Sequence, residues 1–251
     1  MKTTLKIILL AYPDNPVGYE FIKTFQQHHV PIHSIIVKKQ NRANRWKRLT
    51  NKIKKDGLLA ASQRIFHIWK LNFRHRTLVH LAGKYQIPLH WVNRFNSRAC
   101  EAWLQTHTPD LLVIVSAPIL KENIFGHAKI GCLNPHPGWL PVYRGIGANA
   151  YALKNGDKPG VTVHFIDSEI DRGKIICREH IPMQKGDTIA KINDRAMKRG
   201  AGLVINAIQD IENGCLEFPD IREPLGRLYK AMPFRETKIV NRQLKKRSRN
   251  E

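Results

Sequence analysis

Three side chains in this sequence have the types and spacing of a small acyl-transfer site: Asn134, His136 and, 35 residues further on, Asp171. When an amine attacks a carbonyl carbon, negative charge grows on the oxygen. An Asn amide and a His placed beforehand at that oxygen lower the barrier. A carboxylate can orient or charge the imidazole, or take the proton that the amine must lose, directly or through a water. The three residues therefore predict chemistry at a carbonyl group.

Prolines surround the Asn and the His. The prolines at 135, 137 and 141 fix φ and lack an N–H donor, so we expect Asn134 and His136 on a stiff loop outside any helix or strand ladder. The loop follows a strand-like run at 129–133, which predicts a site at the carboxyl end of a strand, where open α/β sheets bind ligands. Taken singly, an Asn and a His in such a loop are also typical of ordinary loop hydrogen bonding.

Four stretches together resemble the folate-dependent formyltransferase family, which includes glycinamide ribonucleotide, methionyl-tRNA and sugar-amine formyltransferases. The stretches are LNPHPGWLP at 133–141, YRG at 143–145, GVTVHFID at 160–167 and DRGKI at 171–175. The resemblance is strong over 109–187, looser in the first forty residues, and absent from 39–73 and from the C-terminal tail. It implies that Asn134, His136 and Asp171 are catalytic and move a formyl group from 10-formyltetrahydrofolate to an amine.

The same resemblance implies where the folate lies. The loop after the strand at 110–116 would line the pterin pocket through Ala117 and Leu120, and the loop at 167–173 would close over the pterin with Asp167, Ser168 and Ile170. For Asp167, a surface carboxylate in a hairpin is an alternative interpretation. Arg172, next to Asp171, could pair with it.

Composition limits the class of protein. A chain of 251 residues can bury a core, and one domain with an appendage is expected. The four cysteines, at 100, 132, 177 and 215, have no paired metal spacing, so we expect neither a metal site nor a disulfide framework. The apolar run near the start is short and meets Pro13, which favours a first strand over a signal peptide. These features predict a cytoplasmic protein, with peripheral membrane association as an additional hypothesis.

The net charge of +22 is concentrated in two segments. Residues 38–76 contain thirteen Lys or Arg against one acid, and residues 222–251 contain ten against three. These segments are either solvated helical faces or surfaces that attract an anion, such as a nucleotide-linked substrate, RNA or an acidic membrane. An amphipathic pattern at 58–73 with Trp and Phe suits core packing or a membrane surface. RNA binding is the weaker interpretation, because no known nucleic-acid module matches.

Alternating apolar runs and helical patterns predict an α/β, Rossmann-like, doubly wound and mostly parallel sheet. We expect a catalytic domain at 1–220 with a basic helical insertion at 39–82, followed by a short basic C-terminal extension at 221–251. Its apolar anchors would be Leu228, Met232, Phe234 and Ile239. The predicted strands are 5–11, 32–37, 88–92, 110–116, 129–133, 160–166 and 174–181, and the predicted helices are 17–28, 98–106, 147–155 and 188–212, the last capped by Asp187.

The acceptor amine follows by elimination, and we expect an amino sugar on a nucleotide or an envelope precursor. The turn at 12–18 contains two prolines and an aspartate and makes a poor phosphate cradle, which counts against glycinamide ribonucleotide. The tail is too short for the second domain of methionyl-tRNA formyltransferases, so tRNA is less expected. Two alternatives are a formyltetrahydrofolate hydrolase, in which water replaces the amine, and a non-catalytic protein that binds membrane or nucleic acid. No feature of the sequence predicts the oligomeric state.

Overall fold

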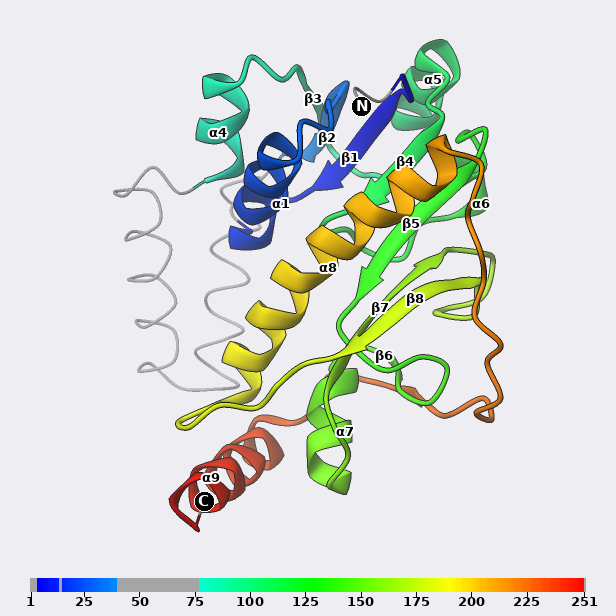
Figure 1. The fold of residues 1–251 in the computed structure, drawn as a ribbon. Coiled ribbons are helices and arrows are strands. Elements are labelled where there is room, and N and C mark those ends of the chain that lie inside the picture. The colour runs from blue at the N-terminus through cyan, green and yellow to red at the C-terminus, as the bar shows by residue number, and fades with distance from the viewer. Residues whose placement is uncertain (1–3, 14, 40–76, 251) are drawn as a thin grey trace.

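The computed structural model describes residues 4–13, 15–39 and 77–250 of the chain. Asp14, most of the predicted insertion 39–82 and all of the basic helix predicted at 58–73 lie outside these residues. In Figure 1 one twisted sheet is flanked by helices. No helix in the described part is long and apolar enough to cross a membrane.

The central sheet has seven strands in the order β3-β2-β1-β4-β5-β7-β8. These are β1 (Ile7–Ala11), β2 (Ser34–Lys38), β3 (Leu89–Val92), β4 (Leu111–Ile114), β5 (Gly131–His136), β7 (Gly160–Phe165) and β8 (Ile175–His180). β1 to β5 pair in parallel, whereas β7 is antiparallel to both β5 and β8. The mostly parallel, Rossmann-like α/β sheet confirms the predicted fold class.

Helices cover both faces of this sheet. They are α1 (Pro16–Gln27), α4 (Leu78–Lys84), α5 (Arg98–His107), α6 (Glu122–Phe125), α7 (Ala148–Asn155), α8 (Ile189–Glu212) and α9 (Phe234–Asn250). The apolar cluster on one face contains residues of α1, α4 and α8, and the cluster on the other contains residues of α5 and α6. The helices therefore form the outer layers of a doubly wound domain.

Strand β1 shows why the apolar run at its position marks a buried strand. Ile7 and Leu9 enter the cluster under α1 and α8, whereas Ile8 and Leu10 enter the cluster under α5 and α6. Successive side chains of a strand point to opposite faces, so a strand covered on both faces is apolar throughout.

The start of α8 differs from the prediction by one residue. Thr188, not Asp187, is the N-cap, and its side chain accepts a hydrogen bond from the Lys191 N–H. The Asp187 carboxylate instead accepts the Gln184 N–H and pairs with Arg195. The Asp187 side chain therefore bonds within the turn before the helix and to Arg195, and does not cap the helix.

The prediction that Asn134 and His136 lie on a loop outside any ladder is wrong. Both belong to β5, and they lie opposite His164 and Thr162 of β7. β5 pairs with β4 only as far as Leu133, so one edge of its last three residues has no strand partner. A proline nitrogen is tolerated in a strand where it faces such a free edge, which explains how Pro135 fits here.

After α8 the chain crosses to the far end of the sheet. There β9 (Leu228–Tyr229) pairs in parallel with β6 (Arg144–Gly145), and α9 follows. Most of the predicted anchors of this tail are wrong. Leu228, Phe234 and Ile239 are exposed, and only Met232 packs on the core. Helix α9 buries Val240 and Leu244 instead.

Helix α4 overlaps the end of the predicted insertion 39–82 and is part of the core. Its N-cap is Thr77, and Leu78 and Leu81 are buried. Leu78 fits against α1 at Gly18, where an added Cβ would lie 2.5 Å from the Leu78 Cδ1. A larger residue at position 18 would force the Leu78 side chain to move.

Candidate active site

The antiparallel pairing of β5 and β7 brings Asn134 and His164 together. The Asn134 side-chain amide lies 3.1 Å from Nε2 of His164. The other ring nitrogen, Nδ1, is 2.7 Å from the Phe165 carbonyl oxygen, which can only accept, so Nδ1 carries the proton. His164 Nε2 is therefore the acceptor, and the Asn134 Nδ2 donates to it.

His164 is neutral at neutral pH. Its side chain is 1% exposed, and burial together with the nearby His136 lowers its pKa from 6.5 to about 4, although Asp171 acts in the opposite direction. A neutral imidazole has one donor and one acceptor, which is what its two hydrogen bonds require. His164 thus fixes the orientation of the Asn134 amide.

His136 is held by the loop that follows it. Its Nε2 lies 3.1 Å from the Tyr143 carbonyl oxygen and so must donate to it. Its Nδ1 then faces Oδ2 of Asp171 at 3.6 Å. Burial lowers the pKa of His136, and the Asp171 charge and the Tyr143 carbonyl oppose this effect without reversing it. The neutral ring therefore presents Nδ1 toward the carboxylate.

Asp171 lies within reach of both histidines. Its Oδ2 accepts the Gly145 N–H at 2.6 Å, and its Oδ1 is 3.8 Å from His164 Nε2. The backbone at Asp171 has a φ of 53°, a left-handed conformation that Asp and Asn adopt more readily than most residues. Arg172, which could have paired with Asp171, pairs instead with Glu169 on the same loop.

The loop between β5 and α7 is fixed close to these side chains. Gly138 approaches so closely that an added Cβ would lie 2.6 Å from His136 Nε2. The buried Thr162 hydroxyl donates to the Gly138 carbonyl at 2.8 Å and accepts the Leu140 N–H at 3.1 Å. The loop is thereby tied to β7 beside the histidine.

The predicted folate-side residues lie in two places. Leu120 is buried in the apolar cluster under α5, and Ala117 packs against the same cluster. Ile166, which directly precedes the loop of Asp167, also packs there, and so the two segments share one apolar support. The remaining residues are Asp167, which accepts the Glu169 N–H, Ser168, which is exposed, and Ile170, whose carbonyl accepts from Arg144.

Two side chains of this cluster were not assigned a role from the sequence. His164 lies on β7 in a mostly apolar run that also contains Thr162, and no local signal in the sequence marks it as a partner of Asn134. Arg144 is buried and donates to the Ile170 carbonyl through Nε at 3.1 Å and Nη2 at 2.7 Å. This contact could not be identified from the sequence, because only the fold brings residues 144 and 170 together.

The described residues contain no group of three or more His, Cys, Asp or Glu side chains that could hold a metal ion. All four cysteines are free, and burial raises the pKa of the Cys100 thiol to about 11. Among the described residues, the side chains of Asn134, His136, His164 and Asp171 bring one amide, two imidazoles and one carboxylate together.

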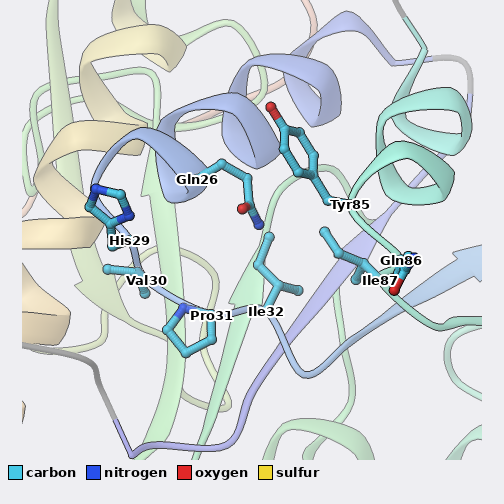
Figure 2. A pocket seen from close by; sticks show the side chains of 8 residues that line it. All are labelled: Gln26, His29, Val30, Pro31, Ile32, Tyr85, Gln86 and Ile87. Atoms are coloured by element: carbon cyan, nitrogen blue, oxygen red, sulfur yellow. The ribbon is translucent and has the colours of Figure 1, made fainter.

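A hollow of about 580 Å³ lies elsewhere, at the amino end of β2 (Figure 2). It is formed where α1 and α4 end, and a left-handed residue follows the C-cap of each helix, His29 with a φ of 57° and Gln86 with a φ of 54°. Tyr85 lies at its rim (Figure 2). The hollow is separate from the Asn134 cluster, which lies at the carboxyl end of β5.

Comparison with known proteins agrees with this geometry. The family model described as formyl transferase matches residues 6–208. The methionyl-tRNA formyltransferase of Azobacteroides pseudotrichonymphae genomovar. CFP2 is 37% identical over 137 residues, which cover 54% of this chain and 42% of that protein. The chain thus aligns with less than half the length of this curated relative.

Two solved structures share the fold. Phosphoribosylglycinamide formyltransferase from Anaplasma phagocytophilum has a TM-score of 0.62 at 20% identity, covering 91% of this chain and 100% of that one. A sugar 3N-formyl transferase solved in the presence of dTDP and 5-N-formyl-THF has a TM-score of 0.56 at 16% identity, covering 91% and 70%. Because the family match spans most of the chain, including the strands and loops of the polar cluster, the chain belongs to the formyl transferase family.

Proposed function

We propose that the chain is a folate-dependent N-formyltransferase that moves a formyl group from 10-formyltetrahydrofolate to an amine. The observation that carries this proposal is the cluster of Asn134, His136, His164 and Asp171, joined by contacts of 3.1 to 3.8 Å. The cluster combines a fixed hydrogen-bond donor with a carboxylate, which are the two groups that acyl transfer to an amine needs.

Asn134 is the proposed donor to the carbonyl oxygen. When bound, the formyl-folate supplies the carbonyl group that the amine attacks. One N–H of the Asn134 amide is donated to His164, so the second N–H is the one that remains for the carbonyl oxygen. Because His164 already fixes the amide, the donor does not reorganise as negative charge develops.

Asp171 is the proposed proton acceptor for the attacking amine. Its carboxylate is 12% exposed and is held by the Gly145 N–H. The Nδ1 atom of His136, at 3.6 Å, carries no proton in the neutral ring and can share the proton that the amine loses. His136 cannot offer Nε2 in the same way, because Nε2 donates to Tyr143.

The folate is proposed to lie between the loop after β4 and the loop after β7. Ala117 and Leu120 would contact the pterin from one side, and Asp167, Ser168 and Ile170 from the other. The shared packing of Ala117, Leu120 and Ile166 supports this placement. The Ile170 carbonyl, which Arg144 fixes, would give the second loop a stable backbone.

For the acceptor we propose an amino sugar on an anionic carrier such as a nucleotide. Helix α9 follows β9 directly and contacts α7, the helix that begins just after Gly145. Its exposed side chains include Arg235, Lys238 and Arg242, and its one acid in the described part, Glu236, pairs with Lys154. A basic helix that packs on α7 would attract a phosphorylated acceptor.

Calorimetric titration with a non-transferable formyl-folate analogue tests the donor side. We expect saturable binding to the wild-type protein and affinity weakened by about 10-fold or more in Ile170→Asp, which puts a charge where the pterin is proposed. Ile130→Asp is the matched control, because Ile130 is exposed and precedes β5 at its amino end. No saturable binding to the folded wild-type protein would contradict the proposal.

Product analysis with different amines tests the acceptor side. The protein is incubated with 10-formyltetrahydrofolate and, in separate reactions, a nucleoside diphosphate amino sugar, methionyl-tRNA and glycinamide ribonucleotide. We expect mass spectrometry to find the formylated amino sugar. Formylation of only the tRNA or the ribonucleotide would contradict the proposed acceptor, and formate release without any acceptor would indicate a hydrolase instead.

A further inference from the structure

Residues 213–233, here called the crossing segment, run from the end of α8 past β7 and β8 to α9 (Figure 1). The segment has almost no regular structure, yet contacts of Phe218, Glu223, Gly226 and Tyr229 hold it. Lys174, which precedes β8, lies 3.5 Å above the Phe218 ring. Glu223, Gly226 and Tyr229 contact the loop after His136. Glu223 also pairs with Arg178 on β8, and Tyr229 also stacks on Tyr151 of α7.

Glu223 ties the crossing segment to the start of that loop. Its carboxylate pairs with Arg178 at 2.7 Å and accepts the Trp139 indole N–H at 3.3 Å. The hydrogen bond from Arg178, helped by its charge, lowers the pKa of Glu223 to about 2. Arg178 also donates to the Leu140 carbonyl at 2.8 Å. One ion pair therefore joins β8, the loop and the crossing segment.

Gly226 lies against the middle of the loop. Its N–H donates to the Pro141 carbonyl at 3.0 Å. An added Cβ at this position would lie 1.8 Å from the Val142 carbonyl oxygen, a distance that no side chain tolerates. Only a glycine lets the two backbones approach this closely.

Tyr229 contacts the two parts of the loop that hold the catalytic candidates. Its carbonyl accepts the Ile146 N–H at 3.0 Å, next to Gly145, whose own N–H holds Asp171. Its ring stacks on Tyr151 at 4.3 Å and on Tyr143 at 5.7 Å, and the Tyr143 carbonyl holds His136. The loop is thus bounded by the crossing segment on one side and the polar cluster on the other.

We propose that the crossing segment positions the active site, with Gly226 and Tyr229 as positioning residues for His136 and Asp171. It would do so by fixing the loop whose Tyr143 carbonyl and Gly145 N–H set the places of these two side chains. The family match ends at residue 208, so these contacts lie beyond the matched part of the chain. The inference rests on the proposed function, because it concerns the same four side chains.

The test compares Tyr229→Ala and Gly226→Ala with the wild-type protein. A displacement of about 1 Å at a catalytic group can lower a rate about 100-fold, so we expect kcat to fall by roughly 10- to 100-fold while KM for the formyl donor changes by less than about 2-fold. Tyr229→Phe keeps the stacked ring and should restore kcat. Tyr85→Ala, at the rim of the hollow in Figure 2, is the control for removing a tyrosine elsewhere.

A second readout needs no substrate. Because the Asp171 charge raises the pKa of His136, a displaced Asp171 should lower this pKa, as measured by NMR titration of the His136 ring in Tyr229→Ala. Tyr229→Phe and Tyr85→Ala should leave it unchanged. A wild-type protein without transferase activity would overturn the proposed function alone. Unchanged kcat and unchanged His136 titration in both Tyr229→Ala and Gly226→Ala would overturn the positioning role.

Discussion

At the scale of residues, the proposed role of Asn134 rests on its hydrogen bond to His164. The amide of a free Asn can rotate, whereas here His164 accepts one N–H at 3.1 Å and has its own second nitrogen fixed by a backbone carbonyl. The sequence identified Asn134, His136 and Asp171 as candidates because their types suit the chemistry. It did not identify His164, since only the register of β5 and β7 places that ring beside the amide.

We predict that His164→Asn lowers turnover by roughly 10- to 100-fold. The shorter Asn side chain reaches only as far as the Nδ1 position of the histidine, so the acceptor for Asn134 is lost. Steady-state kcat with saturating donor and acceptor measures the effect. The matched control is His29→Asn, because His29 is exposed at the end of α1 and its left-handed φ of 57° is one that Asn tolerates. Equal kcat values for the two variants would contradict the assignment.

His164 also predicts a dependence of stability on pH. The unfolded chain protonates this histidine below about pH 6.5, but the folded protein does so only near its lowered pKa of about 4. Between these values the unfolded state binds more protons, so the contribution of His164 lowers the free energy of unfolding as pH falls through this window. Above pH 6.5 both states are neutral and the contribution vanishes.

Urea unfolding at pH 7, 5.5 and 4.5 measures this effect by comparing the wild-type protein with His164→Asn. We expect the wild-type protein to lose more stability than the variant as pH falls, because the variant has no proton to take up at this position. Parallel losses in the two proteins would show that His164 is not buried in its neutral form.

At the scale of elements, most helices and strands could be predicted from the local sequence pattern. The exceptions depend on neighbouring segments of the folded chain. Apolar runs predicted every strand of the central sheet, but the prolines of β5 suggested a loop. A proline is costly only where a neighbouring strand needs its N–H, and β4 has already ended beside Pro135. The two-residue strands β6 and β9 had no sequence signal, since each is a strand only because the other is there.

The N-cap of α8 gives a stability prediction at this scale. Thr188→Ala removes the oxygen that accepts the Lys191 N–H, and should cost about 1 kcal/mol in the free energy of unfolding. Thr24→Ala is the control, because the Thr24 hydroxyl bonds the Glu20 carbonyl inside α1 and caps nothing. It should change stability by less than about 0.5 kcal/mol. The same free energy of unfolding for both variants in urea would contradict the assignment of Thr188 as a stabilising N-cap.

At the scale of the whole molecule, exposed positive charge is concentrated on α9, a helix that contacts α7 and α8. The sequence predicted a basic C-terminal segment, and the structure makes it a helix that packs through Val240 and Leu244, with Asn241 accepting the Ile189 N–H at the start of α8. Its path to the active-site loop was not predictable, since it depends on contacts between residues about 80 positions apart, such as Arg144 with Gly226.

We predict that reversing charge on α9 weakens the use of an anionic acceptor. The double variant Lys238→Glu with Arg242→Glu should raise KM for a nucleotide-linked amino sugar by about 10-fold and leave kcat unchanged, because these side chains are exposed and lie outside the polar cluster. The control Lys23→Glu with Lys84→Glu changes the net charge equally on α1 and α4. An equal rise in KM for both double variants would show that the effect comes from the net charge of the protein and not from the position of α9.

The proposed role of Asp171 is tested by comparing Asp171→Asn with the wild-type protein in formyl transfer from 10-formyltetrahydrofolate to the accepted amine. Asn keeps the shape, tolerates the left-handed backbone and can still accept the Gly145 N–H, but it has no carboxylate to take a proton. Asp220→Asn, on the surface, controls for the same change. We expect folded protein, unchanged donor binding and kcat lowered at least about 100-fold in Asp171→Asn alone. Near-normal turnover in folded Asp171→Asn would contradict the account.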